Sequence, residues 1–414
     1  MHAAWKGVGP MTNSRSRGIP AAHRKASQPA SRRSTHPSLP TARPSGSRTS
    51  LPHARALPCT EHDRTFPWAV IETLTGPDEY SVVLDGVSPR AFARLTRASV
   101  AFGSAVTSRL EFAIKLCLRT GREQDKFFTL PGDRVIRVLA NPVIGPSGKV
   151  HAVIVWSGGA SDEPPPPPIV GAIEWINPGL VKACPTAQFL LCEAHAEGPA
   201  ERTLPEMLSH FEYWDSHAAF LSLFNVENPA DRWIGTAAKT FIDGAHRRLY
   251  LAARASDADS TRTLRAIVCD ISDAPAPGVP DPCPSVIRHM PIPPGHAIGL
   301  VDLGAGVIHE WMADPASRMA GWLHHTPEIH PSDAPLIDAV RKALLSGVRL
   351  TADIKGRIRS APEDEWILLQ ARWSRVSNGE QPQALIDVMP APDPRIGCRR
   401  VRSMSTPSLL GEMV

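Results

Sequence analysis

An internal repeat is the sequence feature that most constrains the fold of this chain. Residues 113–121 read AIKLCLRTG and residues 339–347 read AVRKALLSG, so the two stretches match in residue class. Each has apolar residues at helical spacing, a basic residue on the free face and a glycine where a helix would end. Each is followed by an extended run, a polar turn and a second extended run. The repeat therefore predicts a chain built from copies of one structural unit.

Proline-rich segments divide the chain into units of similar size. Residues 162–168 include five consecutive prolines, and residues 273–284 hold five prolines in twelve positions. Such runs cannot join a helix or a central strand, so we expect stiff, extended linkers. The predicted organisation is a basic tail at 1–65, three modules at 66–161, 169–273 and 290–391, and a flexible tail at 392–414.

Positive charge is concentrated at the N-terminus. Residues 1–60 hold 10 Lys and Arg but no Asp or Glu, whereas the rest of the chain carries 41 acidic and only 35 of the 45 basic side chains. An acidic body argues against a nucleic-acid partner, which requires a basic face. Because the N-terminal segment lacks a continuous apolar run, we predict neither a secretory signal nor a membrane partner. We expect a disordered tail or a misassigned start codon, with an organelle address as the remaining alternative.

The cysteines indicate neither a metal site nor a disulfide framework. The seven are scattered and form no CxxC motif: Cys59, Cys117, Cys184, Cys192, Cys269, Cys283 and Cys398. An odd, scattered set favours a reducing compartment, so the expected location is the cytoplasm. Cys117 and Cys269 stand in apolar runs and are expected to be small core residues.

Each predicted module begins with a short apolar strand and ends with a hairpin pattern. The opening strands are expected at 68–74, 171–176 and 296–301. The closing hairpins are expected at 135–144 with 150–156, at 249–254 with 264–270, and at 366–373 with 384–389. These runs predict antiparallel pairs with one buried face. A helix between the opening strand and the hairpin completes an α+β unit, in which helices cover one face of an antiparallel sheet.

The helix of the third module is predicted to begin at Pro331, because proline suits the first helical position. Asp333 would then place negative charge at the positive end of the helix dipole. The expected buried stripe consists of Leu336, Val340 and Leu344, and the expected surface ion pair is Asp338 with Lys342. In the first module the stripe consists of Leu110, Ile114, Cys117 and Leu118. The helix of the middle module is expected within 204–224.

Residues 329–340, IHPSDAPLIDAV, carry the pattern His-Pro-x-Asp at this expected helix start. The stretch resembles the start of the helix that precedes the long sheet strands in PAS domains. The whole layout is similar to a small family of actinobacterial triple sensor-domain proteins, which carry PAS-like and GAF-like modules in a row. The segments that carry this resemblance are 68–74, 133–137, 148–156 and 330–336.

The resemblance implies an α+β fold of three tandem PAS-like or GAF-like modules, each an antiparallel sheet covered by helices and joined to the next by a proline-rich linker. The third module is expected to be PAS-like. A regulatory role without catalytic machinery is also implied. No kinase, cyclase or helix-turn-helix pattern accompanies the modules, so a signal would leave through contact with an unidentified signalling protein.

Residues 145–149, GPSGK, invite a phosphate-loop interpretation. The motif would need a glycine at Val143 and a hydroxyl at Val150, and predicted strands flank it on both sides. No helix follows to offer its N-terminus to a phosphate. A hairpin turn is therefore favoured.

Histidines supply the other candidate sites. The densest group of metal-ligand side chains is His324, His325, Glu328 and His330. A loop that leads into a helix accounts for this group, so we predict no metal site. The middle module offers His195, His210 and His217 as candidate haem ligands. His210 and His217 are expected to share a helix face, but exposed helix histidines are common.

The sequence therefore predicts a non-enzymatic regulatory protein that senses a small molecule or a partner protein. The ligand would lie between the inner face of a sheet and its covering helices, where apolar walls meet a few polar groups. We expect this pocket in the third module, lined by Leu300, Trp311, Ile367 and Trp373. The cofactor is unknown. The alternatives are an enzyme with a divergent active site in one module, or a scaffold whose cores are filled.

Overall fold

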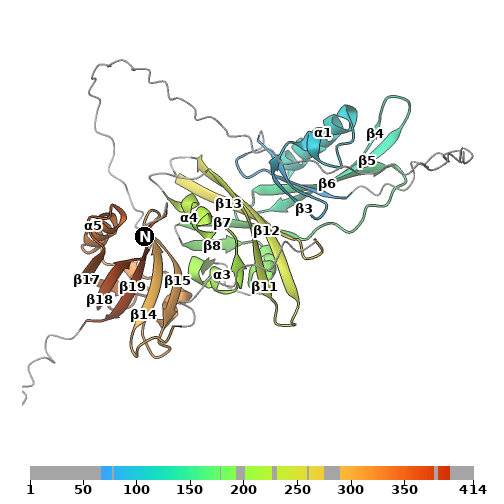
Figure 1. Ribbon diagram of the computed structural model, residues 1–414. Helices are drawn as coiled ribbons and strands as arrows, with labels where there is room; N and C mark the ends of the chain where they lie inside the picture. Colours follow the sequence, from blue (N-terminus) through green and yellow to red (C-terminus); the bar gives the residue numbers. More distant parts are fainter. Residues whose placement is uncertain are drawn as a thin grey trace, which may run out of the picture. The chain divides into compact units, whose positions relative to one another are not determined.

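Three antiparallel sheets, of six, seven and six strands, carry the fold (Figure 1). The computed structural model describes residues 67–76, 79–177, 179–192, 201–225, 231–258, 261–274, 290–376 and 381–391. All of these belong to one unit, Glu61–Val414. The predicted tails at 1–65 and 392–414 lie outside the described residues, and so do residues 275–284 of the second proline-rich segment. The module boundaries stay predictions.

The first sheet has the strand order β3-β2-β1-β6-β5-β4. Its strands are β1 (Ala69–Glu72), β2 (Ser81–Asp85), β3 (Ser88–Ala93), β4 (Gln124–Thr129), β5 (Val135–Ile144) and β6 (Val150–Gly159). The predicted hairpin is confirmed, because β5 and β6 pair antiparallel. The turn interpretation of 145–149 is confirmed as well, since the Gly148 N–H donates to the Gly145 carbonyl at 2.9 Å.

Helix α1 (Ser104–Thr120) packs on one face of this sheet. The predicted stripe is confirmed: Leu110, Ile114 and Cys117 are buried, and Leu118 is half-buried against the same core. The helix ends at Gly121, whose φ of 62° lies in the left-handed region. Glycine adopts this conformation without strain, which explains why the repeated sequence places a glycine there.

The second sheet has the order β10-β11-β12-β13-β7-β8-β9. Its strands are β7 (Val170–Asn177), β8 (Leu180–Ala183), β9 (Glu201–Thr203), β10 (Tyr213–Trp214), β11 (Arg232–Thr240), β12 (His246–Ala258) and β13 (Thr261–Asp270). The predicted hairpin is again confirmed by the antiparallel pairing of β12 with β13. Its helices are short: α2 (Pro185–Cys192), α3 (Leu204–Ser209), α4 (His217–Leu221) and the 3-10 turn η3 (Ser222–Phe224).

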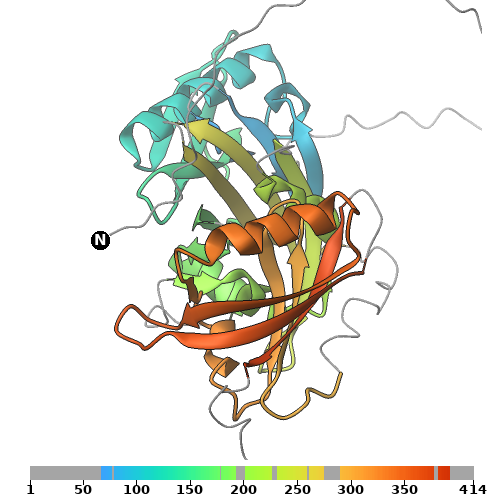
Figure 2. The same cartoon turned by 90° about the vertical axis from the view of Figure 1, so that its left-hand side faces the viewer.

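The third sheet has the order β15-β14-β19-β18-β17-β16. Its strands are β14 (Ala297–Asp302), β15 (Val307–Ala313), β16 (Glu328–Ile329), β17 (Thr351–Arg359), β18 (Ile367–Arg375) and β19 (Gln383–Pro390). The predicted pairing of the last two strands is confirmed. Helix α5 (Ala334–Leu345) runs across the strands of this sheet (Figure 2).

The start of α5 differs from the prediction. The helix begins at Ala334, so Pro335 rather than Pro331 occupies its first turn. The reason lies in Asp333, whose carboxylate accepts hydrogen bonds from Nε and Nη2 of Arg357 at 2.9 and 2.8 Å and thereby fixes the preceding turn to β17. These bonds hold the pKa of Asp333 well below its usual range.

The predicted stripe of α5 is right in two positions and wrong in one. Val340 and Leu344 are buried, but Leu336 is 51% exposed. Ile337 packs against the core instead, at helical spacing from Val340 and Leu344. The predicted surface pair forms, with Asp338 Oδ2 at 3.0 Å from Lys342 Nζ.

The first and second sheets share one apolar core. From the first sheet it includes Trp68, Val70, Val83, Ile154 and Trp156, and from the second Ala172, Tyr250, Ala252, Ile267 and Cys269. The prolines between the two sheets join this contact, because the Trp68 Nε1–H donates to the Pro165 carbonyl at 2.6 Å. The linker at 162–168 is therefore tied to the first sheet.

The fold class predicted from the sequence, tandem PAS-like or GAF-like modules with a helical cover on each sheet, is wrong. Strand accounts for 44% of the structure and helix for 21%, and the sheets include two half-barrels. The second face of the first sheet lies against the second sheet, so no helix covers it. The sequence of β6, VHAVIVWSGG, carries the signal: it is buried at nearly every position, as expected of a strand buried on both faces.

A buried ion pair joins the first two sheets beside their shared core. Glu72 on β1 is fully buried. Its Oε1 accepts hydrogen bonds from Nε and Nη2 of Arg254 on β12, at 3.0 and 2.8 Å. The Ser81 hydroxyl and the Leu74 N–H donate to the same carboxylate. Because the lone pairs are satisfied, the charge of Glu72 is compensated in an apolar setting.

A second polar contact crosses the same interface. His151 on β6 is fully buried, and its Nε2 lies 2.8 Å from Oε1 of Glu174 on β7. The Ser147 hydroxyl, in the turn between β5 and β6, donates to the same oxygen. Gly145 makes room for the ring, since a Cβ there would lie 2.3 Å from His151 Nε2. Gly145 therefore serves the contact between the two sheets.

The ion pair generates a stability prediction. Arg254→Met leaves the Glu72 carboxylate buried without its cation, so we expect the free energy of unfolding to fall by about 3–5 kcal/mol. Urea denaturation followed by circular dichroism measures the change. The double variant Glu72→Met with Arg254→Met removes both charges and is expected to recover most of the loss. A double variant no more stable than the single variant would contradict the assignment.

Candidate functional site

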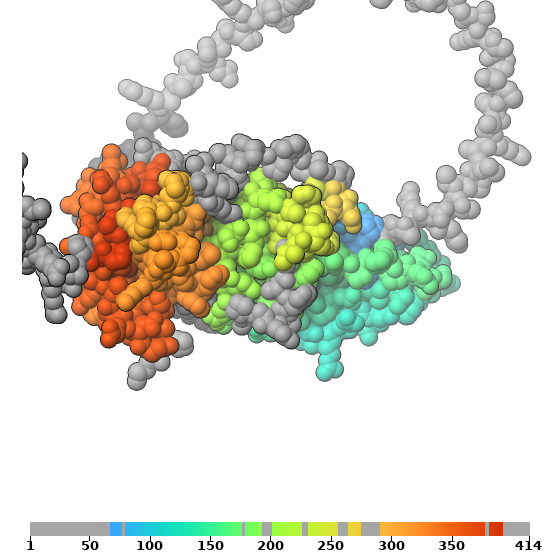
Figure 3. Space-filling model, turned by 90° about the horizontal axis from the view of Figure 1, so that it is seen from below, coloured from blue at the N-terminus to red at the C-terminus, as the bar shows by residue number. Residues whose placement is uncertain are grey.

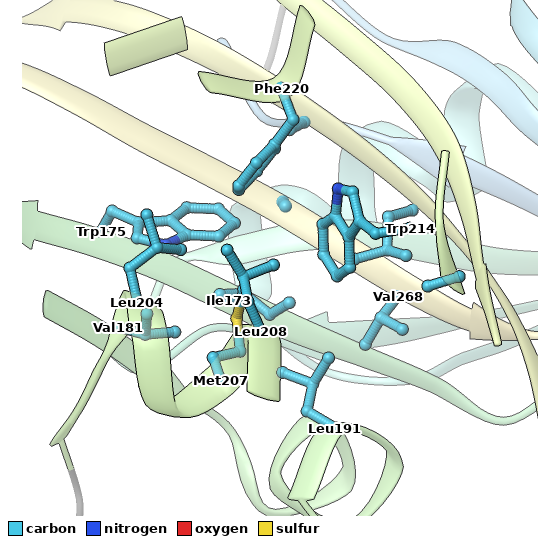
Figure 4. Packing of buried hydrophobic residues seen from close by; sticks show 14 of the residues in the cluster. Ile173, Trp175, Val181, Leu191, Leu204, Met207, Leu208, Trp214, Phe220 and Val268 are labelled. Atoms are coloured by element: carbon cyan, nitrogen blue, oxygen red, sulfur yellow. The ribbon is translucent and has the colours of Figure 1, made fainter. Parts of the chain in front are cut away.

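A cluster of aromatic side chains fills the space between the inner face of the second sheet and its short helices. Its tryptophans are Trp175 on β7, Trp214 on β10 and Trp233 on β11, and its phenylalanines are Phe211, Phe220 and Phe224. The Trp214 and Trp233 rings stack, with centroids 5.7 Å apart and planes 2° apart. Trp175 meets Phe220 edge to face at 5.7 Å. Figure 4 shows Trp175, Trp214 and Phe220 converging with Leu208 of α3.

Strand alternation places Trp233 in this cluster. Along β11 every second residue from Trp233 to Lys239 is buried, as expected of a strand with one covered face. Gly235, the next residue on that face, has no side chain, and a Cβ there would lie 2.2 Å from the Trp233 ring. The indole therefore lies flat over the bare backbone of Gly235, which fixes one wall of the cluster.

The cluster contains three buried hydrogen-bond donors without acceptors. Trp175, Trp214 and Trp233 are 2%, 8% and 5% exposed, and none of their indole N–H groups has a hydrogen-bond partner among the described residues. Most buried polar groups in folded proteins are paired, and an unpaired donor costs about 1–3 kcal/mol. Elsewhere Trp311 donates to the Met319 carbonyl at 3.0 Å and Trp322 to the Ser360 hydroxyl at 3.1 Å. Trp373, in the core of the third sheet, also lacks a described acceptor, so what distinguishes the cluster is that it holds three such donors together.

The chemistry of the cluster would suit a flat, weakly polar molecule. Its walls are aromatic, and its polar groups are donors only, so they match carbonyl, ether or ring-nitrogen acceptors. The nearest cation on the same face of β11 is Lys239, which is 2% exposed and donates to the Leu191 carbonyl at the end of α2, at 3.1 Å. A cation at a helix C-terminus is favourably placed there without any ligand.

Residues of the third sheet, in orange, lie against residues of the second sheet, in green, in Figure 3. Val307 on β15 belongs to the aromatic cluster's core. Two residues further, His309 is 1% exposed and its ring centroid lies 4.8 Å from that of His217 on α4. Burial, together with the neighbouring His217, lowers the pKa of His309 well below its ordinary value. His309 is therefore a neutral side chain at the contact between the second and third sheets.

The pocket residues predicted in the third module are placed as follows. Trp311 and Trp373 are buried in the core of the third sheet, and Ile367 is half-buried against it. Leu300 follows Gly299, over which the Trp311 ring lies, so strand alternation turns Leu300 to the opposite face of the sheet. Three of the four residues thus share one core. Trp311 also stacks on Trp322, at 5.3 Å between centroids.

The candidate metal ligands have separate partners. His324 Nδ1 lies 3.4 Å from Oε1 of Glu206, and Glu328 pairs with Arg359 at 2.7 Å. His330 receives the Ser332 backbone N–H on its Nδ1, and its ring packs on Trp366. Within the described residues no three His, Cys, Asp or Glu side chains are grouped so that they could hold a metal ion.

The candidate haem ligands are not arranged as predicted. His210 caps the end of α3 and His217 begins α4, so the two do not share a helix face. His195 lies outside the described residues. The aromatic cluster itself escaped sequence reasoning, because its tryptophans come from three strands far apart in the chain. Only the alternation around Trp233 marks one of them as buried.

Comparisons with known proteins identify the fold. Residues 67–167 match the family described as Rv3651-like, N-terminal. The chain is similar to a crystal structure of an uncharacterized protein from Mycobacterium tuberculosis, with a TM-score of 0.61 and 22% identity over 80% of this chain and 98% of that one. At this identity the likeness shows the fold alone.

Other comparisons add nothing to the assignment. The structure of an RNA-binding Light-Oxygen-Voltage receptor aligns with 53% of this chain and 95% of that one at 10% identity, but its TM-score of 0.21 is too low to carry an argument. No curated protein matches the sequence. Among the described helices, none has the length and apolar character needed to cross a membrane.

The packing of Trp233 on Gly235 generates a second prediction. Gly235→Ala forces the indole away from the strand, so we expect a loss of about 1–3 kcal/mol in the free energy of unfolding and a changed near-ultraviolet circular dichroism spectrum. Gly321→Ala is the matched control, because a Cβ at Gly321 meets no atom within 4 Å. Equal stability of the two variants would show that Trp233 does not depend on Gly235.

Burial of His309 generates a pH prediction. In the unfolded chain a histidine titrates near pH 6.5, whereas the pKa of folded His309 is depressed. Above pH 6.5 both states are neutral, but below it only the unfolded state gains the proton, so stability falls by up to about 1.4 kcal/mol per pH unit. His309→Leu should flatten the dependence between pH 6.5 and 5.

Urea midpoints at three pH values measure this slope. The control His325→Leu removes an exposed histidine and is expected to keep the wild-type slope. A slope that His309→Leu leaves unchanged would show that His309 takes up its proton in the folded state as easily as in the unfolded one.

Proposed function

We propose that this protein is a non-enzymatic regulator that binds a small, flat, uncharged molecule in the aromatic cluster of the second sheet. The observation that carries the proposal is the set of three buried indole N–H groups, on Trp175, Trp214 and Trp233, that have no acceptor among the described residues. Burying these N–H groups without acceptors costs free energy in the ligand-free protein, and a ligand that supplies acceptors removes this desolvation cost. The same donors give the site its preference for a molecule with acceptors.

The composition of the cluster supports binding rather than catalysis. Its buried described members are aromatic and aliphatic side chains and Met207, which supply no general acid or base, and the thiols packed against them are those of half-buried Cys184 and Cys192. The Cys184 Sγ accepts a hydrogen bond from the Ala172 N–H. Acid–base chemistry on a ligand requires a general acid or base within hydrogen-bond reach. We therefore keep the expectation of a non-enzymatic protein as part of the proposal.

The edge of the cluster supplies a route by which a bound state could alter a partner contact. Val307 and His309 of β15 touch the cluster and α4, so a shift of α4 on ligand binding changes the packing of the third sheet. A ligand changes a contact with a partner protein only if it binds one conformation of this protein more tightly than another. The proposed output is a change in the affinity for a partner protein.

The test compares a planar ketone with its counterpart that lacks the acceptor. Thermal unfolding of the full chain is followed with 9-fluorenone and with fluorene, and mass spectrometry identifies molecules that the purified protein retains. Fluorenone is expected to raise the melting temperature more than fluorene. At a hundred-fold excess over its dissociation constant a ligand adds about 2.7 kcal/mol of stability.

Two matched variants locate the site. Trp233→Phe removes a donor from the aromatic cluster and is expected to weaken ligand binding by roughly 3- to 10-fold. Trp373→Phe makes the same change in the core of the third sheet, where the indole N–H also lacks a described partner, and should leave binding unchanged. The reverse result would move the site to the third sheet. No retained molecule and no shift with either compound would leave an interaction scaffold with filled cores.

A further inference from the structure

A hollow of about 620 Å³ lies at the edge of the first sheet, at β3 and the turn that follows it. Its lining residues are Arg90, Ala91, Phe92, Ala93, Arg94 and Arg97. Two further arginines reach it from the second sheet, because the Arg232 and Arg254 guanidinium carbons lie 5.4 and 4.5 Å from the centre of the Phe92 ring. Arg90, Arg94 and Arg97 thus line the hollow together with Phe92, and Arg232 and Arg254 lie over the Phe92 ring.

The backbone at this hollow is strained. Phe92 has a φ of 50°, in the left-handed region that a bulky residue rarely adopts. The pairing of β2 with β3 shifts register just beside it, between Val82 and Leu84. The position is held from the second sheet, where the Tyr250 hydroxyl donates to the Arg90 carbonyl at 2.8 Å. Strain of this kind persists where the surroundings fix it, and it clusters at ligand sites.

Two of the five arginines are already neutralised. Arg254 is bound to Glu72 at 2.8 Å, as described above. Arg90 lies 3.3 Å from Asp85, whose side chain is 2% exposed and also accepts from the Ser99 N–H and hydroxyl. These two pairs are structural, since each carboxylate is buried.

The other three arginines have no carboxylate partner among the described residues. Arg94, Arg97 and Arg232 are exposed, and within the described part of the chain no ion pair involves any of them. Exposed arginines are commonly just solvated. Here, however, Arg94 and Arg97 line a hollow whose backbone is fixed, and Arg232 is held against the ring of Phe92, which lines the same hollow. A fixed group of like charges is electrostatically unfavourable until an anion binds.

We propose that this hollow binds a small molecule that carries a diphosphate group. A guanidinium group is planar and can donate two parallel hydrogen bonds to the oxygens of a phosphate. A single carboxylate has too few oxygens to bind three arginines in this way. A diphosphate brings three to four negative charges in a compact volume and matches the three unneutralised cations. The site is separate from the aromatic cluster and does not depend on the ligand proposed there.

Isothermal titration of inorganic pyrophosphate into the full-length protein tests the proposal. We expect saturable binding at 50 mM salt that weakens at 200 mM salt, as screening requires. The double variant Arg94→Ala with Arg97→Ala is expected to bind at least ten-fold more weakly. The matched control, Arg122→Ala with Arg134→Ala, removes the same charge from exposed positions of the same part of the chain and should bind like the wild type.

Three outcomes would overturn the proposal. The first is the absence of pyrophosphate binding to the folded wild type. The second is an equal loss in the variant and its control, which would mean that only net charge matters. The third is citrate binding as tight as pyrophosphate binding, which would make the hollow a general anion site. Circular dichroism verifies that each variant is folded. Fluorenone binding to the arginine variants separates this proposal from the aromatic site, since it should be unchanged.

Discussion

The shared core between the first and second sheets is the constraint on which the rest of this structure depends. Strands β1 and β6 bury both faces, one against α1 and the other against the second sheet. Such a core excludes water on both sides, so the polar side chains at its margin must find partners within the protein. Glu72 finds Arg254, and Glu174 finds His151. The position of one sheet against the other is thereby fixed by these polar side-chain pairs as well as by the buried apolar area.

The other face of the second sheet takes no part in this shared core and holds the aromatic cluster instead. The short helices α2, α3 and α4 supply little polar surface, so the indole donors of Trp175, Trp214 and Trp233 meet aromatic rings instead of acceptors. The same fixed interface holds Arg232 and Arg254 over Phe92 of the first sheet. Both proposed sites therefore follow from how the second sheet is positioned.

Local sequence patterns were sufficient for some of the elements and for some of their packing, but strands such as β2, β3 and β8 were not predicted. The three hairpins, the α1 stripe around Ile114 and the Asp338–Lys342 pair follow from periodicities that a short window contains. The start of α5 did not, because the bond between Asp333 and Arg357 joins residues that are distant in sequence. In the predicted pocket, Leu300 and Trp311 lie on opposite faces of the sheet because side chains alternate along a strand. Which face a residue takes depends on strand register, which residue type alone does not set.

By itself the sequence determined where strands, turns and helices form, since apolar spacing, proline and glycine act over a few residues. It also determined that β6 is buried along its length, although that signal was not taken into account in the predicted fold class. Only the tertiary structure decided which face meets which, and so placed a second sheet where helices were expected. It alone brought three tryptophans and five arginines together, because strand pairing and sheet packing join residues that no local pattern connects.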